Sequence, residues 1–325
     1  MHRFWVEWSD ANPELVQLFH AALVCFLAFD SQRVPRMIGT GFIVDASRDW
    51  AVIVTAKHVL GRGVSDAQNP DPRHAPSAIF LPENLGIPSL DPKRLRAIWR
   101  GRNKDQVLAL NICHASYNEA LDLAVCIAIP QTGDERKIEP ASIVIDAGTP
   151  AVGEQVFMVS IDELGVDETC PPNGSGNRHQ ELQISRRTNI RSGVVTGRYE
   201  AGYRQYKWPC FTTSIPAKAG MSGGLVGLWR PGQTVAACGV VCADNSTKES
   251  HSSYLECGES VVGCLWPVLA LQLPDQIPIP AGTVLKTIYE KMVSGHLTKA
   301  LDLERVVVRH LEDGGSQVQY HEKRT

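Results

Sequence analysis

The sequence predicts an all-β fold. Short apolar runs rich in valine and isoleucine recur over most of the 325 residues, and glycine, proline, aspartate and asparagine separate them. This pattern is typical of a β-sandwich or β-barrel. No long helical pattern alternates with the runs, which argues against a parallel sheet built from βαβ units. The runs that predict strands are residues 22–29, 39–44, 50–56, 78–82, 108–115, 122–129, 154–161, 192–197, 223–229, 234–242 and 260–266.

Helices are predicted only near the two ends of the chain. Residues 12–20 have Asn12 as a candidate N-cap and Pro13 at the first helical position, where proline is favoured. Near the other end, apolar residues between Val284 and Val293 recur at helical spacing, which predicts a C-terminal helical extension. We expect its apolar face to pack on the β domain, with a partner protein as the alternative.

Three long loops and a weakly ordered end are also predicted. The loops cover roughly residues 61–77, 83–94 and 162–181, and long loops on a β scaffold often carry specificity. The polar last residues, 312–325, are expected to be weakly ordered.

The charge and the N-terminal sequence restrict the class of protein. The formal net charge is −3 and the isoelectric point is about 6.4, so no basic surface is expected to attract nucleic acid. The first 15 residues hold two tryptophans and three acids where a secretory signal would hold an apolar run. The apolar stretch 15–29 is too short to span a bilayer. We therefore expect a soluble cytoplasmic protein without a membrane partner.

The nine cysteines are interpreted as reduced, buried thiols. Two of them, Cys25 and Cys126, lie in strongly apolar runs, where cysteine acts as a small hydrophobic residue. Their spacing makes a zinc site an alternative for four others: Cys238, Cys242, Cys257 and Cys264. These spacings do not match common zinc motifs closely, and a disulfide would need an oxidising compartment. We expect no metal and no cofactor.

Three motifs bring together the residue types of nucleophilic catalysis. His58 ends the β-type run in "VIVTAKHVL", Asp122 begins the run in "LDLAVCIAI", and Ser222 lies in "KAGMSGG". A serine hydroxyl is a poor nucleophile until an imidazole takes its proton, and a buried carboxylate holds that imidazole in the required tautomer. Gly220 can adopt backbone angles closed to other residues, so its N–H and that of Ser222 are candidate oxyanion-hole donors.

Each of these residues also has a purely structural interpretation. His58 can be a core histidine, Asp122 can cap a turn, and Ser222 can be one polar residue in a glycine-rich turn. Asp105 is a rival carboxylate, but it lies in the polar stretch "RGRNKDQ" without a following apolar strand. The order of the three motifs favours catalysis over a non-catalytic member of the same fold.

The sequence resembles the trypsin-like, chymotrypsin-fold serine peptidases. The motifs "GTGFIV", "TAKHV", "DLAV" and "GMSGG" occur in the family's order, and the resemblance spans Val24 to Leu271. It implies that Ser222 is the nucleophile, His58 the general acid and base, and Asp122 the residue that orients His58, while Gly220 and Ser222 form the oxyanion hole. It also implies two packed six-stranded antiparallel β-barrels. The expected organisation is an N-terminal segment 1–20, a first barrel 21–135, a second barrel 136–272, and a linker with a helical tail 273–325.

Met221 departs from the secreted digestive members of this family. Those members carry an acid before the serine, and it pairs with a new N-terminal amine released by cleavage. Methionine cannot form this ion pair, and "RMIGTGF" does not match the family's new N-terminus. The sequence is therefore closer to intracellular, HtrA-like branches. Either preformed packing or rearrangement on binding a partner must shape the oxyanion hole.

The resemblance also predicts where a substrate side chain binds. Pro216 occupies the position six residues before the serine, where trypsin-like relatives that select basic side chains carry an acid. The opposite wall is expected from residues 239–244, which include Val240, Val241 and Asp244. This favours a small or apolar side chain, unless Asp244 reverses the preference. An extended substrate would pair with the strand edge.

The sequence thus predicts an endopeptidase that acts through an acyl-enzyme on protein or peptide substrates. Two alternatives stay open. One is a non-catalytic module that holds extended peptides in the cleft that the resemblance implies between the two barrels. The other is an effector that an activating protein partner switches on, because the usual cleavage switch is absent.

Overall fold

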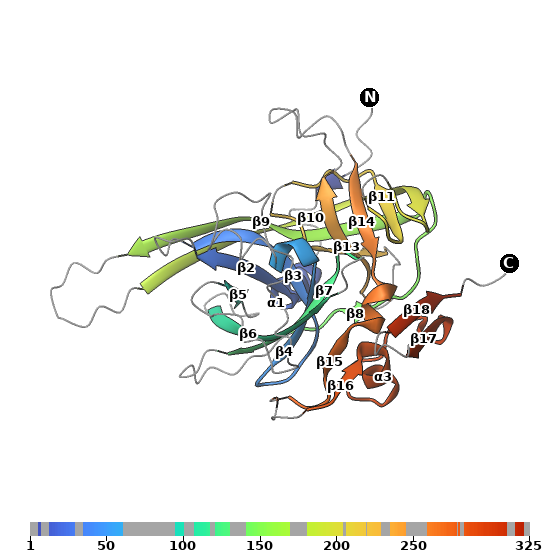
Figure 1. Cartoon of the computed structure of the whole chain (residues 1–325). Coiled ribbons are helices and arrows are strands. Elements are labelled where there is room, and N and C mark those ends of the chain that lie inside the picture. The colour runs from blue at the N-terminus through green and yellow to red at the C-terminus, as the bar shows by residue number, and fades with distance from the viewer. Residues whose placement is uncertain are drawn as a thin grey trace.

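The structure is a computed structural model in which two β units lie side by side, with the C-terminal segment against them (Figure 1). The predicted all-β fold is confirmed. The structure describes residues 6–7, 13–29, 35–60, 95–100, 107–117, 121–130, 141–169, 181–203, 206–218, 220–228, 235–244, 259–277, 279, 283–310 and 316–321.

The first unit is a closed six-stranded barrel with the strand order β2-β3-β4-β7-β6-β5. Every pairing in it is antiparallel. β4 is completely buried and β7 nearly so, which agrees with their uninterrupted apolar sequences. The strands are β2 (Leu23–Phe29), β3 (Pro35–Ala46), β4 (Ala51–Thr55), β5 (Leu95–Arg100), β6 (Val107–Tyr117) and β7 (Ala124–Pro130).

The second unit is a curled eight-stranded sheet. Its order is β1-β10-β11-β14-β13-β12-β9, and β9 pairs again with β10, so that six of its strands form a ring. The short β1 and β8 extend this ring, and β8 runs parallel to β13. The strands are β1 (Val6–Glu7), β8 (Val144–Ile145), β9 (Gln155–Thr169), β10 (Glu181–Tyr199), β11 (Cys210–Thr213), β12 (Leu225–Leu228), β13 (Ala236–Asp244) and β14 (Ser260–Cys264).

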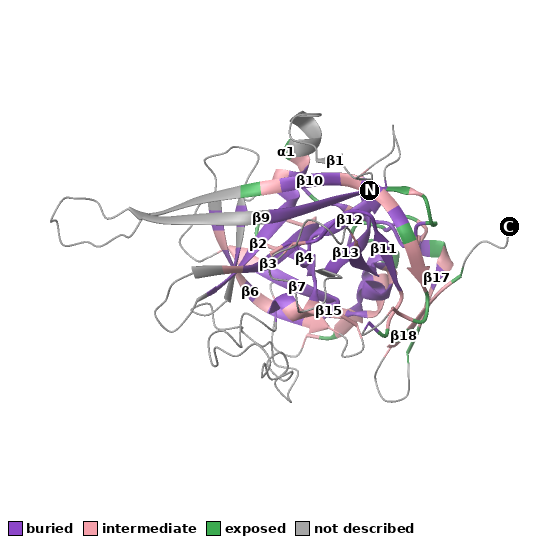
Figure 2. Ribbon diagram, turned by 90° about the horizontal axis from the view of Figure 1, so that it is seen from above, coloured by how far each residue is buried: buried purple, intermediate pink, exposed green. Residues whose placement is uncertain are grey.

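The predicted N-terminal helix is present as α1 (Pro13–Ala22). Phe19 of α1 is fully buried, and its ring lies 5.5 Å from that of Phe157 in the second unit. Trp99 Nε1 of the first barrel donates a hydrogen bond to the carbonyl oxygen of Ala21. The helix therefore contacts both units, and buried residues run through both sheets (Figure 2). Among the described residues, no helix has the length and apolar character needed to cross a membrane.

Part of one predicted loop is a β-ribbon. Within residues 162–181, β9 continues to Thr169, and its partner strand β10 begins at Glu181. The two strands pair from Gln155 to Thr169, which satisfies backbone groups that a loop would leave to water. The loop prediction is therefore wrong for residues 162–169, because pairing with β10 decides their conformation. The other two predicted loops and the predicted strand 78–82 lie outside the described residues.

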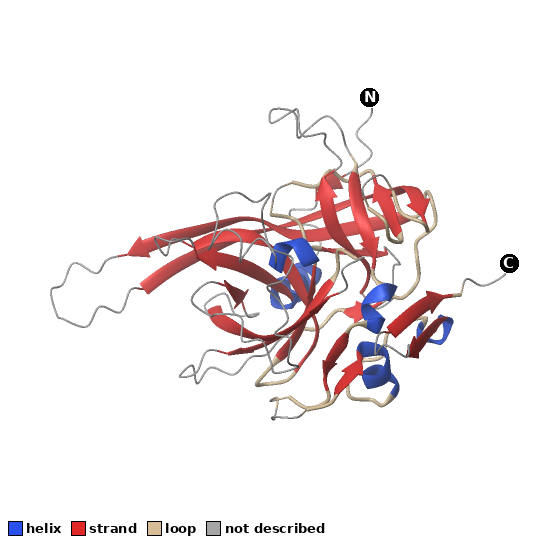
Figure 3. Ribbon diagram, in the orientation of Figure 1, coloured by secondary structure: helices blue, strands red, loops and turns tan. Residues whose placement is uncertain are grey.

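The C-terminal segment contains less helix and more strand than the sequence predicts (Figure 3). The helix α3 (Ile288–Val293) has six residues, and 3-10 turns cover Trp266–Ala270 and Leu303–Arg305. β15 (Gln272–Pro274) pairs with β16 (Leu285–Thr287), and β17 (Val306–His310) pairs with β18 (Ser316–Tyr320).

The prediction of a weakly ordered end is wrong for residues 316–320, which form β18. The ring of Tyr320 stacks on that of Trp266 at 6.2 Å, and Val318 packs against the core. These contacts with residues distant in the sequence order residues 316–320, although the segment is mostly polar.

Candidate active site

The structure brings His58 and Asp122 into direct contact. β4 ends at Thr55 and leads into a helical turn, 57–60, that carries His58. Asp122 precedes β7, and Thr55 faces Ala124 across the β4–β7 pair. Because neighbouring antiparallel strands place the end of one beside the start of the next, the two side chains meet.

Both carboxylate oxygens of Asp122 hold His58. Oδ2 lies 2.7 Å from Nδ1 of the ring, and Oδ1 accepts a hydrogen bond from the backbone N–H of His58 at 3.0 Å. A carboxylate accepts hydrogen bonds, so the neutral ring carries its proton on Nδ1 and leaves Nε2 as the basic nitrogen. The His58 side chain is 27% exposed and that of Asp122 is 12% exposed. The rival carboxylate, Asp105, lies outside the described residues.

Cys242 lies beside Asp122 and belongs to the second sheet. Its thiol is 3.9 Å from the carbonyl oxygen of Asp122. Burial raises the pKa of Cys242 well above its ordinary value, and the charge of Asp122 raises it further. The thiol therefore stays protonated. Cys238, Cys242 and Cys264 are free and buried, and the described residues hold no metal-ligating cluster of three or more His, Cys, Asp or Glu side chains; Cys257 lies outside them.

Ser222 lies in a turn that is hydrogen-bonded to the first barrel. Its carbonyl oxygen accepts a hydrogen bond of 2.8 Å from the backbone N–H of Thr40 on β3. Thr40 Oγ1 donates to the carbonyl oxygen of Gly220 at 3.1 Å and accepts from the N–H of Ile161 at 3.1 Å. Thr55 Oγ1 donates to the carbonyl oxygen of Thr40 at 2.7 Å. Thr40 therefore joins the serine turn, the first barrel and the second sheet.

Two glycines allow this close approach. A methyl group at Gly39 would lie 2.5 Å from a Val59 methyl carbon and 2.9 Å from the carbonyl oxygen of Ser222. Val59 directly follows His58 in the sequence. Gly39 therefore lies between the histidine turn and the backbone of Ser222, and only a residue without a side chain fits there. Gly223 has a φ of 83°, and a side chain there would overlap the carbonyl oxygen of Thr40. Only glycine fits this conformation and this space.

The backbone N–H groups of the turn fall into two sets. Those of Met221, Gly223 and Gly224 donate to backbone carbonyl groups at 3.1, 2.8 and 2.9 Å. Within the described part of the chain, those of Gly220 and Ser222 donate to no group. Gly220 has a φ of 90°. The two N–H groups that the sequence selected as oxyanion donors are therefore the two that the fold itself does not use.

The serine and the histidine are not joined by a hydrogen bond in this structure. Ser222 is 8% exposed, and its hydroxyl forms no hydrogen bond with any described residue. Catalytic hydrogen bonds are often long in unliganded enzymes and tighten with substrate. The structure therefore pairs His58 with Asp122 and places the backbone of Ser222 nearby.

The residues of the predicted substrate pocket lie close to the core. Val240 and Val241 have no exposed surface, and they point into different clusters of core residues. Pro216 is also buried, and the side chain of Asp244 lies outside the described residues. The valines offer no accessible surface to a substrate here, and the side-chain preference stays a prediction.

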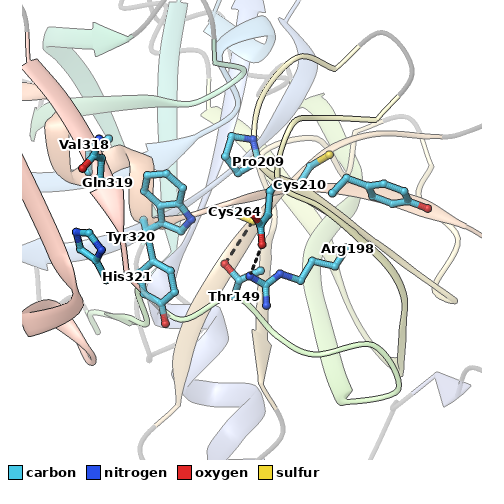
Figure 4. A pocket seen from close by; sticks show the side chains of 12 residues that line it. Thr149, Arg198, Pro209, Cys210, Cys264, Val318, Gln319, Tyr320 and His321 are labelled. Atoms are coloured by element: carbon cyan, nitrogen blue, oxygen red, sulfur yellow. Dashed lines mark hydrogen bonds and ion pairs between the residues drawn. The ribbon is translucent and has the colours of Figure 1, made fainter. Parts of the chain in front are cut away.

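A cavity of about 440 Å³ lies away from these residues. It separates the second sheet from the β17–β18 hairpin, with Tyr320 and His321 on one side and Arg198 and Thr149 on the other (Figure 4). None of the candidate catalytic residues lines it. The cavity is therefore not part of the candidate active site.

Sequence reasoning missed Thr40 and a buried arginine, Arg191. Thr40 is a polar residue between Gly39 and Gly41 in a strand, and glycine within a strand often marks a close backbone approach. Arg191 lies in the alternating series with Gly193 and Val195 on β10, so its charge faces inward. A charged residue at an inward position was the signal that could have revealed it.

Comparison with known proteins places the chain in a family. The model of the trypsin-like peptidase domain matches residues 39–236, which is more than half of the chain. No curated protein matches the sequence. The match includes His58, Asp122 and the serine turn. The chain therefore belongs to the trypsin-like peptidase domain family.

Proposed function

We propose that this protein is a serine endopeptidase in which Ser222, His58 and Asp122 act as a catalytic triad. The observation that carries the proposal is the two-point contact between Asp122 and His58. One carboxylate oxygen fixes the ring and the other fixes the main chain of the same residue. A carboxylate placed in this way orients the imidazole and stabilises its protonated form during the reaction.

The proposed reaction proceeds through an acyl-enzyme. Ser222 Oγ attacks the peptide carbonyl carbon while His58 Nε2 takes the hydroxyl proton. The tetrahedral oxyanion receives hydrogen bonds from the N–H groups of Gly220 and Ser222. As the C–N bond breaks, His58 gives its proton to the leaving amine. Water then attacks the ester with His58 as base, which releases the carboxylic acid and restores Ser222.

The proposal includes control by a partner protein rather than by cleavage of a proenzyme. Met221 is 1% exposed and apolar, so it cannot hold a newly released N-terminal amine. This favours the HtrA-like branch of the family and a cytoplasmic location. An N-terminal extension that is not processed should leave the activity unchanged, and activity that appears only after its removal would contradict this part.

The second candidate is a non-catalytic module that binds extended peptides along the same cleft. The observation that favours it is the Ser222 hydroxyl, which has no hydrogen bond to His58 in this structure. Such a module would pair a peptide with a strand edge. It would bind peptides equally well with and without the Ser222 hydroxyl and would release no products.

Cleavage of a peptide library distinguishes the two candidates. We expect the wild-type protein to cleave members of the library and Ser222→Ala to bind them without cleavage. His58→Ala should lower kcat by about 10⁴-fold or more, because the triad acts as a unit. Ser294→Ala is a matched control, because Ser294 is exposed and lies in the C-terminal segment. A folded wild-type protein that binds but never cleaves, even with candidate partners, supports the binding module instead.

A further inference from the structure

Arg191 is a buried cation beneath the serine turn. It lies on β10 and is 1% exposed, and it is among the largest fully buried side chains. Its NH1 group donates to the carbonyl oxygen of Pro216 at 3.0 Å and lies 3.4 Å from Met221 Sδ. The same sulfur accepts from the N–H of Lys218 at 3.1 Å. One guanidinium group thus holds both ends of the segment from Pro216 to Met221.

The strand that carries Arg191 also holds the start of this segment. The Ser214 hydroxyl accepts from the N–H of Val194 at 3.0 Å, and the N–H of Ser214 donates to the carbonyl oxygen of Val194 at 2.9 Å. A methyl group at Gly193 would lie 2.6 Å from both Ile215 and the Ser214 hydroxyl. Arg191 and Gly193 lie on the same face of β10 because strand side chains alternate. The path of the chain into the serine turn is therefore set by β10.

We propose that Arg191 is a positioning residue that orients the oxyanion hole from inside the second sheet. This inference rests on the proposed function. Gly220 and Ser222, whose N–H groups donate to no described residue, flank Met221 directly. Holding the Met221 side chain inward fixes the peptide groups on both sides of it, and an oxyanion hole is effective only when its donors are fixed before the reaction.

The Arg191 guanidinium group is a cation that lies beside the residue before the serine without any cleavage of the chain. Met221 cannot pair with a new N-terminal amine, yet the guanidinium group of Arg191 lies against its side chain. Burying a charged group is costly unless it is well hydrogen-bonded, and an apolar side chain would fill the same core position without that cost. A positioning role explains why the fold tolerates this desolvation cost: the guanidinium group keeps the backbone of the serine turn in the orientation that the reaction requires.

A merely structural role for Arg191 predicts a different result from a positioning role. If Arg191 only stabilises the second sheet, a variant that remains folded should react at the wild-type rate. If Arg191 positions the donors, the folded variant should react slowly while it binds the reagent normally. The rate of labelling by an alkyl fluorophosphonate separates these cases, because its saturating rate and its half-saturating concentration report reaction and binding separately.

The test compares Arg191→Met and Arg191→Lys with Val195→Ala. Val195 lies on the same strand, is 1% exposed and belongs to the same core cluster as Met221. We expect Arg191→Met to lower the saturating labelling rate by about 10²-fold or more, the effect of losing one oxyanion donor, with an unchanged half-saturating concentration. Arg191→Lys should be labelled faster than Arg191→Met but more slowly than the wild type. Val195→Ala should react like the wild type below its melting temperature.

The outcomes separate this inference from the proposed function. A wild-type protein that is never labelled overturns the proposed function, and this inference with it. A labelled wild type together with a folded Arg191→Met that reacts at the wild-type rate overturns this inference alone. If Arg191→Met does not fold, Arg191→Lys decides: a reduced rate in the folded variant supports the positioning role, and an unchanged rate overturns it.

Discussion

The Asp122 carboxylate contacts His58 at two points, one on the imidazole ring and one on the backbone. The carboxylate accepts from the ring nitrogen and from the backbone N–H of His58. Asp122→Asn keeps the size of the side chain, but its amide group can donate to Nδ1 and favours the tautomer with the proton on Nε2. His58 in that tautomer cannot act as the base.

We therefore expect Asp122→Asn to fold and to lose most of its activity. The value of kcat should fall by about 10⁴-fold, because the ring no longer presents a basic nitrogen to Ser222. The measurement is steady-state cleavage of a library-derived peptide, with thermal melting as a control for folding. Near wild-type kcat in the folded variant would show that Asp122 is not the orienting residue.

Thr40 joins the two β units through one hydroxyl group. Thr40→Val removes the donor to the Gly220 carbonyl oxygen and the acceptor for the Ile161 N–H. Leaving a buried N–H unpaired costs about 1–3 kcal/mol, so we expect a loss of stability of this size and a lower kcat. Thr40→Ser keeps the hydroxyl group and is the matched control. Urea denaturation measures the stability, and steady-state cleavage measures kcat. If Thr40→Val equals Thr40→Ser in both quantities, the Thr40 hydroxyl does not have this role.

The sequence revealed the chemical groups of the site but not what supports them. His58, Asp122 and Ser222 could be chosen because each stands next to an apolar run, and the structure brings the first two into contact. Thr40 and Arg191 left only weak signals, a polar residue between two strand glycines and a charge at an inward position, and their contacts could not be predicted because their partners are backbone groups far along the chain. A carbonyl group leaves no mark in the sequence, so contacts to it appear only when the fold is known.

At the scale of elements, strands with continuous apolar sequences were predicted well and mixed ones were missed. β4 and β7 stand out as valine- and isoleucine-rich runs. β5 has the sequence LRAIWR, in which two arginines interrupt the apolar residues, and β11 has only four residues, CFTT. Both are strands because neighbouring strands pair with them on both sides. Pairing with distant segments decides such cases, and local composition does not.

His114 on β6 should make the first barrel sensitive to acid. It is 6% exposed, and burial lowers its pKa below the ordinary value of 6.5, although a hydrogen bond to the Gln272 carbonyl oxygen opposes this shift. Below about pH 6.5 the unfolded chain binds a proton that the folded chain does not. Folding stability is therefore lost as the pH falls from 6.5 toward the folded pKa.

Comparison of His114→Gln with the wild type isolates this effect. The wild type should lose more free energy of unfolding than the variant between about pH 7.5 and 5.5, a range that spans the ordinary histidine pKa. Urea denaturation at both pH values gives the difference. The exposed His296→Gln is the control and should follow the wild type. Parallel losses in the wild type and His114→Gln would contradict the prediction.

Lys291 fastens α3 to the β15–β16 hairpin. Its ammonium group donates to the carbonyl oxygens of Pro274 and Asp275 at 3.0 and 2.9 Å, and the side chain is 3% exposed. Burial lowers the pKa of Lys291. Lys291→Met fills the same space but leaves two acceptors without a donor, so we expect a loss of about 1–3 kcal/mol in stability. Lys299→Met, at an exposed position, should change the denaturation midpoint little, and equal midpoints for the two variants would contradict the account.

At the scale of the whole molecule, the candidate active site lies where the two β units meet. The histidine turn and Asp122 come from the first barrel, whereas the serine turn comes from the second sheet and binds Thr40 of the first. The resemblance to trypsin-like peptidases implied this division. It did not predict how far the C-terminal hairpins extend, because their stability depends on contacts such as the stacking of Tyr320 on Trp266.

The central claim is that Ser222 is a nucleophile activated by His58. The most direct test treats the whole chain with a fluorophosphonate and maps the adduct by mass spectrometry. We expect one phosphonyl group on Ser222, its loss in Ser222→Ala, and labelling that is strongly slowed in His58→Ala. A folded protein that gains no adduct on Ser222, or whose labelling is unchanged in His58→Ala, would contradict it.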